Sequence, residues 1–155
     1  MTSFSATKNH RWLVGIPQSP NDDYFPLDTT WVWDYKASGS YQLPADIQFS
    51  TLLDLQNGAY GQRTYTFRSI PQSSTVTSRL EPFGAEQGPM RYTMNLRASK
   101  IFKLGKKNMR FDVDALNTFN ANTAWVSTYV AGPTFGYTTA ILSPRVIRFG
   151  ASYEF

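Results

Sequence analysis

Two carboxylates in the last third of the chain have a spacing that could support chemistry. Asp112 and Asp114 are two positions apart, and residues at that spacing in a strand point to the same face. They could form an acid–base pair or bind calcium, because both need converging oxygens. Alternation places Arg97, Arg110 and Arg148 on the same side of their predicted strands. A network of ion pairs explains all five residues without catalysis, and we predict that network.

One polar stretch nearby could contact a ligand. It contains three asparagines followed by a tryptophan, at Asn117, Asn120, Asn122 and Trp125. Asparagine also favours turns, because its side chain bonds to nearby backbone and tolerates left-handed conformations. The stretch therefore indicates either a ligand contact or a plain transition from strand to loop.

The remaining composition limits the chemistry further. The chain has no cysteine and one histidine, His10, so thiolate nucleophiles and disulfides are excluded and imidazole chemistry has little room. We predict no enzymatic activity, no cofactor and no metal ion. The first twenty residues contain no apolar stretch after a basic one, so we expect no signal peptide in this sequence.

The charge balance is basic, at +4 with an isoelectric point near 9.4, which could indicate nucleic acid or an anionic surface. The densest basic stretch surrounds one glycine and comprises Lys100, Lys103, Lys106 and Lys107. The other basic residues are scattered singly. We interpret the lysine stretch as a solvated turn and expect no nucleic-acid partner.

Alternation of apolar and polar residues dominates the sequence. It predicts strands over residues 29–43, 47–56, 91–104, 109–115 and 146–155, and a further strand over residues 9–16. No segment has the spacing and caps of a helix. The mean hydropathy is -0.36, and no apolar run approaches the ~18 residues that a membrane helix needs. The prediction is an all-β fold, an antiparallel meander of about six strands.

The connections differ in length. Tight turns are predicted at residues 44–46 and 105–108, whereas residues 17–28, 57–90 and 119–143 form long loops rich in Gly, Pro, Asn, Ser and Thr. Short turns at one end and long loops at the other are typical of outer-membrane barrels. Trp31 and Tyr41 lie on one face of a strand roughly 23 Å apart along the membrane normal, at ~3.3 Å per residue and ~45° tilt. With Trp33 they match the aromatic belts that flank an apolar band of ~25 Å.

Three stretches resemble one known family. PRVIRFGASYEF (144–155) resembles the final strand of TonB-dependent outer-membrane receptors. NLRASKIFKLGKKNMRFDVDALNTFNANTA (95–124) looks like their penultimate hairpin, and TTWVWDYKASGSYQLPADIQFSTLLDLQNGAYGQRT (29–64) like the hairpin before it. The resemblance covers roughly residues 8–155 and is similar to receptors that carry an N-terminal carboxypeptidase-like regulatory domain. It implies that Phe149, Tyr153 and Phe155 form the signal read by the barrel assembly machinery.

The resemblance also shows what this sequence lacks. It contains no TonB box, no plug, and about six strands where a plugged transporter barrel has about 22. We therefore expect residues 1–155 to be a C-terminal portion of such a receptor, an open curved sheet located in the bacterial outer membrane. Its partners would be the lipid bilayer, the assembly machinery and the rest of the barrel with its plug, and TonB only through the missing N-terminal part. Uptake of siderophores, cobalamin or glycans would belong to the whole barrel.

Two alternatives remain at this point. Alternation is identical in a soluble carbohydrate-binding β-sandwich or barrel, whose apolar faces meet in a core. Its sugar-stacking platform would use the four tryptophans, Trp12, Trp31, Trp33 and Trp125. We prefer the interfacial belt, because indole suits a boundary with one wet and one apolar side. The other alternative is a rim protease of acidic residues with His10, but nothing in the sequence places a carboxylate beside His10.

Overall fold

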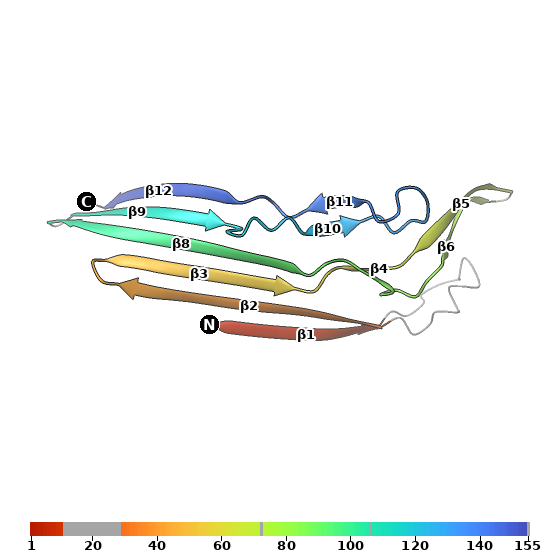
Figure 1. Cartoon of the computed structure of the whole chain (residues 1–155), viewed down its shortest axis with the longest axis horizontal. Coiled ribbons are helices and arrows are strands. Elements are labelled where there is room, and N and C mark those ends of the chain that lie inside the picture. The colour runs from red at the N-terminus through yellow and green to blue at the C-terminus, as the bar shows by residue number, and fades with distance from the viewer. Residues whose placement is uncertain (11–28, 72, 106, 155) are drawn as a thin grey trace.

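The chain is a single antiparallel meander in the computed structural model, which describes residues 1–10, 29–71, 73–105 and 107–154 (Figure 1). Across these ranges there is no helix, and hence none that could span a membrane. Six strands form the main sheet in the order β1-β2-β3-β8-β9-β12. Their bounds are β1 (Thr2–His10), β2 (Thr29–Leu43), β3 (Ile47–Gln56), β8 (Arg91–Leu104), β9 (Lys107–Leu116) and β12 (Val146–Glu154). The predicted all-β meander of six strands is confirmed.

Agreement with the predicted bounds is closest where alternation is strong. β2, β3 and β8 occupy residues 29–43, 47–56 and 91–104 as predicted, and β9 begins at Lys107, earlier than expected. The first strand was predicted at residues 9–16; β1 begins earlier, at Thr2, and includes Asn9 and His10, and residues 11–16 lie outside the described residues. Its own alternation is weak, and it is held by pairing along β2, with Phe4 opposite Tyr35 and Ala6 opposite Trp33.

The register of the strands separates two faces. One row of neighbours across five strands is apolar and consists of Tyr41, Phe49, Ala98, Val113 and Phe149. The row that begins one residue along β3 consists of Ser50, Arg97, Asp114 and Arg148. Because successive side chains in a strand point to opposite faces, these rows lie on opposite sides of the sheet. We call them the apolar face and the polar face.

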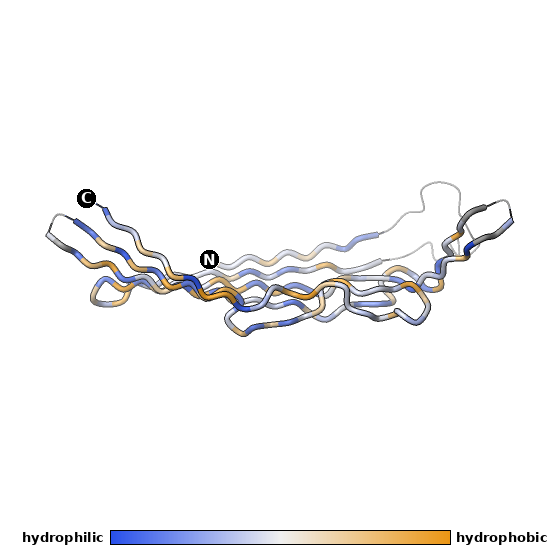
Figure 2. The backbone as a smooth tube through the Cα atoms, turned by 90° about the horizontal axis from the view of Figure 1, so that it is seen from above, coloured by the Kyte–Doolittle hydropathy of each residue, from blue (hydrophilic) through white to orange (hydrophobic). Residues whose placement is uncertain are grey.

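No second layer of described residues covers the apolar face. The six long strands form one curved layer (Figure 2), and the outer edges of β1 and β12 pair with no other described strand. Four side chains that a sandwich would bury are exposed, Trp31 at 57%, Phe49 at 39%, Phe111 at 43% and Phe149 at 80%. Among the described residues the only buried hydrophobic side chain is Ala121. The two-sheet architecture of the soluble alternative is therefore wrong.

The two ends of the sheet differ. At the turn end, residues 44–46 join β2 to β3, and residues 105 and 106 join β8 to β9. Ala45, Asp46 and Gly105 take positive φ angles of 66°, 57° and 68°, as tight reversals between antiparallel strands require. The second turn is shorter than the predicted 105–108, because Lys107 already pairs with Leu104.

At the loop end, the long connections carry strands of their own. They form three small two-stranded sheets, β4 (Tyr60–Gly61) with β7 (Glu86–Gln87), β5 (Thr64–Ile70) with β6 (Ser73–Arg79), and β10 (Ala124–Ser127) with β11 (Thr138–Ile141). These segments were predicted as loops. β5 does alternate, with Tyr65 and Phe67 between Thr64, Thr66 and Arg68, and that signal was missed. β4, β7, β10 and β11 are too short to show a period of two.

Candidate functional site

The five charged residues that the sequence brings to notice lie together on the polar face. Arg97 in β8 and Arg148 in β12 both flank Asp114 in β9. Arg97 donates from Nε to Asp114 Oδ1 at 2.5 Å and from Nη2 to Oδ2 at 3.0 Å, while Arg148 Nη2 lies 3.4 Å from the same Oδ2. One carboxylate thus links three strands through two guanidinium groups, and the bidentate pair fixes their relative height.

The second carboxylate forms a neighbouring cluster. Asp112 accepts from Ser99 Oγ at 2.5 Å and from Arg110 Nε at 2.8 Å, and Arg110 Nη2 donates to Ser99 Oγ at 3.0 Å. Ser99 is only 3% exposed, the most enclosed side chain of this group. Gly150 faces Asp112 from β12 without a side chain. Ser99, Arg110 and Asp112 therefore each have a hydrogen-bond partner within the sheet.

This arrangement holds charges in place and does not converge on an empty point. Asp112 Oδ1 and both oxygens of Asp114 accept from arginine or serine donors, and in the described part of the chain no three metal-ligating side chains come together. His10 ends β1 at the loop end, opposite Thr29. Strands β2, β3 and β8 separate it from both aspartates. His10 therefore does not lie beside Asp112 or Asp114.

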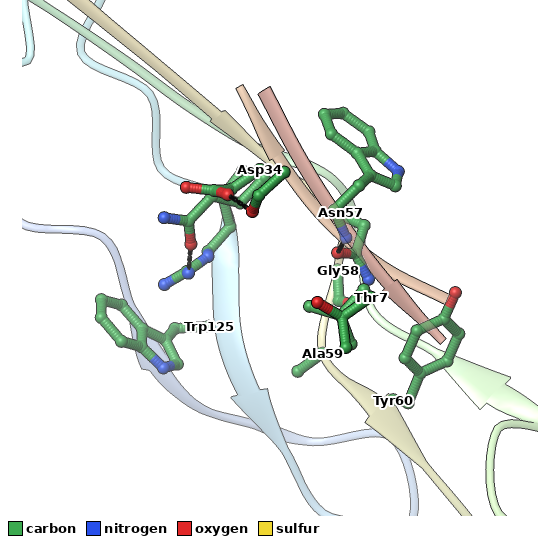
Figure 3. Close-up of a pocket in the computed structure, with 12 residues that line it drawn as sticks. Thr7, Asp34, Asn57, Gly58, Ala59, Tyr60 and Trp125 are labelled. Atoms are coloured by element: carbon green, nitrogen blue, oxygen red, sulfur yellow. Dashed lines mark hydrogen bonds between the residues drawn. The ribbon is translucent and has the colours of Figure 1, made fainter. Parts of the chain in front are cut away.

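A cavity of about 350 Å³ opens on the polar face at the loop end (Figure 3). Its floor is a row of neighbours across four strands, formed by Ser5, Asp34, Gln56 and Arg91. Ser5 donates to Asp34, and Arg91 donates to Gln56. Trp125 closes one side, with the guanidinium carbon of Arg91 4.2 Å from its ring centroid.

The cavity was not predicted from the sequence. Its floor could have been found by aligning the two hairpins, since Asp34, Gln56 and Arg91 sit at matching heights once the register is known. Its wall could not, because Trp125 belongs to the long connection after β9 and reaches Arg91 only through the β10–β11 pair. The cavity contains one carboxylate and one guanidinium, and both already have partners in the sheet.

The asparagine stretch forms the transition out of β9. Asn117 is 7% exposed with φ at 49°. Its Nδ2 donates to the carbonyls of Ala121 and Ser143, and its Oδ1 accepts from the Ala121 amide at 2.9 Å. Asn120, with φ at 53°, accepts from the Arg145 amide at 2.9 Å. Both side chains bind backbone, so they shape the chain rather than face a ligand.

The described tryptophans do not all lie in one place. The register puts Trp31 and Trp33 on the same side of β2 as Tyr41. Trp33 and Trp125 both line the loop-end cavity, and Trp31 is not among its lining residues. Trp12 lies outside the described residues, so a sugar-stacking platform of all four tryptophans stays a prediction.

Two of the three residues of the predicted assembly signal lie in the described part of the chain. Phe149 is 80% exposed and Tyr153 50% exposed, both on the apolar face of the edge strand β12. Phe155 lies outside the described residues. The two aromatic rings project from the last strand where an apolar neighbour could contact them directly.

The apolar face, the ion-paired polar face and the loop-end cavity are thus the three features with functional potential. Comparison of the chain with protein families, curated proteins and solved structures finds no match.

Proposed function

We propose that this chain is a structural part of a bacterial outer-membrane β-barrel wall. In this proposal it is the C-terminal segment of a TonB-dependent receptor for a large nutrient of the siderophore, cobalamin or glycan class. Its partners are the lipid bilayer, the barrel assembly machinery, and the rest of the barrel with its plug. TonB itself would engage only an N-terminal part of such a receptor. Alone, the segment would neither catalyse a reaction nor support uptake.

One observation carries the proposal: a single curved layer presents one apolar and one charged face, and no described element covers the apolar one. A contiguous exposed apolar surface marks a membrane or protein interaction site. Barrel walls in membranes place apolar side chains outward and polar side chains inward with the same period of two. The ion pairs of Asp112 and Asp114 suit a polar interior, because charges there keep both water and partners.

The distribution of aromatic residues and connections supports the same function. Trp31 and Tyr41 lie near opposite ends of β2 on the apolar face, as belts at two membrane boundaries require. The tight turns and long loops lie at opposite ends of the sheet (Figure 1). The sequence resemblance supplies the family, and the two faces supply the physical reason for a lipid environment.

A soluble carbohydrate-binding fold is the second candidate, and the structure favours it less. Such a fold would need the apolar face to meet another sheet, whereas Trp31 and Phe149 stay more than half exposed. The loop-end cavity, which Trp33 and Trp125 line, is where such a fold would bind a sugar.

The test uses two tryptophans of nearly equal exposure on opposite faces, Trp31 at 57% and Trp125 at 51%. Two variants of the full chain each keep one of them and carry Phe at the other tryptophan positions. After reconstitution in lipid vesicles, bromine-labelled acyl chains should quench the fluorescence of Trp31 strongly. Trp125 should instead respond to a quencher dissolved in water, because its face borders the polar interior.

Equal quenching of both variants by brominated lipid would contradict the proposal. So would a chain that stays in buffer as a soluble monomer and leaves Trp31 open to the aqueous quencher. The second result would favour the soluble candidate, and binding of oligosaccharides at Trp125 would then become the measurement to make.

A further inference from the structure

Lysines at the turn end of the sheet divide between its two faces. Lys100 in β8 stands in the row of Ile47 and Phe111, and Lys107 at the start of β9 alternates with Met109. Both therefore belong to the apolar face. Lys103 is on the polar face, opposite Asn108. A charged residue on an apolar face is costly unless its head group reaches a polar neighbour.

The lysine on the polar face forms an ion pair, and the two lysines on the apolar face do not. Lys103 Nζ forms an ion pair with Asp46 Oδ1 at 2.9 Å. Lys100 Nζ donates to the carbonyl of Ala45 in the tight turn and lies 5.4 Å from the ring centroid of Phe102. Lys107 Nζ lies 5.7 Å from the ring centroid of Tyr153. Among the described carboxylates none lies within 4.0 Å of Lys100 or Lys107, so both ammonium groups keep uncompensated charge.

An apolar aromatic ledge adjoins these two charges. Phe102 and Phe111 pack edge to face with centroids 5.8 Å apart, and both rings are more than 40% exposed on the apolar face. Tyr153 continues the ledge on the next strand, opposite Met109. The ammonium groups of Lys100 and Lys107 lie over the rings of Phe102 and Tyr153. Lysine beside apolar side chains near the end of a strand can place its charge at a membrane boundary.

We propose that Lys100 and Lys107 each bind the phosphate of an anionic phospholipid at the turn end of the apolar face, with the acyl chains against the rings of Phe102, Phe111 and Tyr153. This inference rests on the proposed function. The ligand is chosen by its two-part chemistry, because the site pairs uncompensated cations with a continuous exposed apolar surface. An acidic protein segment would match the charges and would leave the ledge exposed.

The experiment compares two double variants of the full chain that lose the same net charge. Lys100→Gln with Lys107→Gln removes the proposed site. Lys8→Gln with Lys103→Gln is the matched control, because Lys8 lies on the apolar face at the loop end and Lys103 lies on the polar face. Binding to vesicles of phosphatidylcholine alone is measured beside binding to vesicles that also contain phosphatidylglycerol, and the ratio of the two partition coefficients is the readout.

We expect the site variant to lower that ratio by about fivefold for each lysine removed, the effect of one basic residue at an anionic membrane surface. The control should change it by less than about twofold. A third variant, Lys100→Arg with Lys107→Arg, should keep the wild-type ratio because it keeps both charges. Equal losses in the site variant and the control would overturn the inference, since only net charge would then matter.

The same data separate this inference from the proposed function. If the chain binds phosphatidylcholine vesicles and substitution of Lys100 and Lys107 leaves the ratio of partition coefficients unchanged, the apolar face contacts lipid and the phosphate site is wrong. If the chain binds neither kind of vesicle, both proposals fail together. If the site variant loses preference for an acidic peptide but not for anionic vesicles, the partner is protein and the lipid site is again wrong.

Discussion

Val113 and Asp114 are neighbours in β9, and their surroundings have nothing in common. Val113 is 42% exposed in an apolar row between Ala98 and Phe149, whereas the Asp114 side chain is 13% exposed and bound by two arginines. The polar side of this sheet is the satisfied side, and the apolar side is the one without partners. A soluble domain shows the reverse, with apolar residues enclosed and charges in water. The contrast teaches that the charged face finds its partners within the sheet, whereas the apolar face has no covering layer among the described residues.

The strongest test of this contrast places the same charge on each face. Val113→Arg should lower the free energy of unfolding in bilayers by about 2–4 kcal/mol, the cost of arginine facing lipid near the midplane of a barrel wall. Ser152→Arg, on the polar face opposite Arg110, should cost far less. Urea titration of the chain reconstituted in bilayers measures both values.

Bilayer thickness provides the control for that measurement. A buried site in a soluble core would also reject arginine, but its penalty would not depend on lipid. The cost at Val113 should change with acyl-chain length, because depth in hydrocarbon determines it. A penalty at Val113 that stays constant across lipids would contradict the proposal that the apolar face contacts lipid.

A smaller loss is expected from removing the central charge of the polar face. Asp114→Asn keeps the shape of the side chain and takes the carboxylate from Arg97 and Arg148. It should destabilise the sheet by less than Val113→Arg, and the loss should shrink at high salt because these arginines are about half exposed to water.

The matched variant for this test is Asp54→Asn. Asp54 is on the same face, in the row of Lys36 and Thr93, and forms no ion pair with a residue that the structure describes. If both substitutions cost the same at low salt in the same bilayers, the network around Asp114 contributes nothing beyond a single surface charge.

The smallest effect is expected where the long connection touches the polar face. Trp125→Leu removes the ring from Arg91 and should cost about 0.5–1 kcal/mol, the usual value of a cation–π contact at an exposed site. This loss should not vary with bilayer thickness. Phe119→Leu is the control, because Phe119 is 64% exposed and in the same connection. Urea titration in two lipids of different chain length would measure both losses of stability. A loss at Trp125 that depends on bilayer thickness would contradict its placement on the polar face.

Much of the sheet was predictable because a single period governs it. Alternation from Thr29 to Leu43 fixes both the length of β2 and the faces of its residues, and the same signal places Arg97, Asp114 and Arg148 on one side. Their pairing follows once neighbouring strands are in register. The start of the weakly alternating β1 was predicted seven residues too late, because that start depends on pairing with β2 and not on its own residues.

The loop end was not predictable for a different reason. Its contacts join segments far apart in the chain through irregular connections, as where the Thr64 amide donates to the Tyr129 carbonyl. Two backbone segments also approach each other closely there, since a Cβ atom at Gly58 would lie 1.7 Å from the Gly88 carbonyl oxygen. Neither feature has a period that sequence reasoning can read, so the β10–β11 pair and the cavity beneath it emerge only from the three-dimensional structure.

The turn at residues 44–46 controls more than a change of direction. The Asp46 carbonyl accepts from the Ile101 amide at 3.1 Å, and its carboxylate holds Lys103 at 2.9 Å, so the turn of one hairpin is anchored on the first strand of the next. A slip of one residue between β3 and β8 would exchange the faces and is opposed by the whole apolar row. A slip of two residues would keep every side chain on its proper face, and alternation cannot oppose it. The anchored turn opposes this slip, because the slip would break both bonds of Asp46. The turn therefore specifies the register between β3 and β8 that the alternating pattern leaves undetermined.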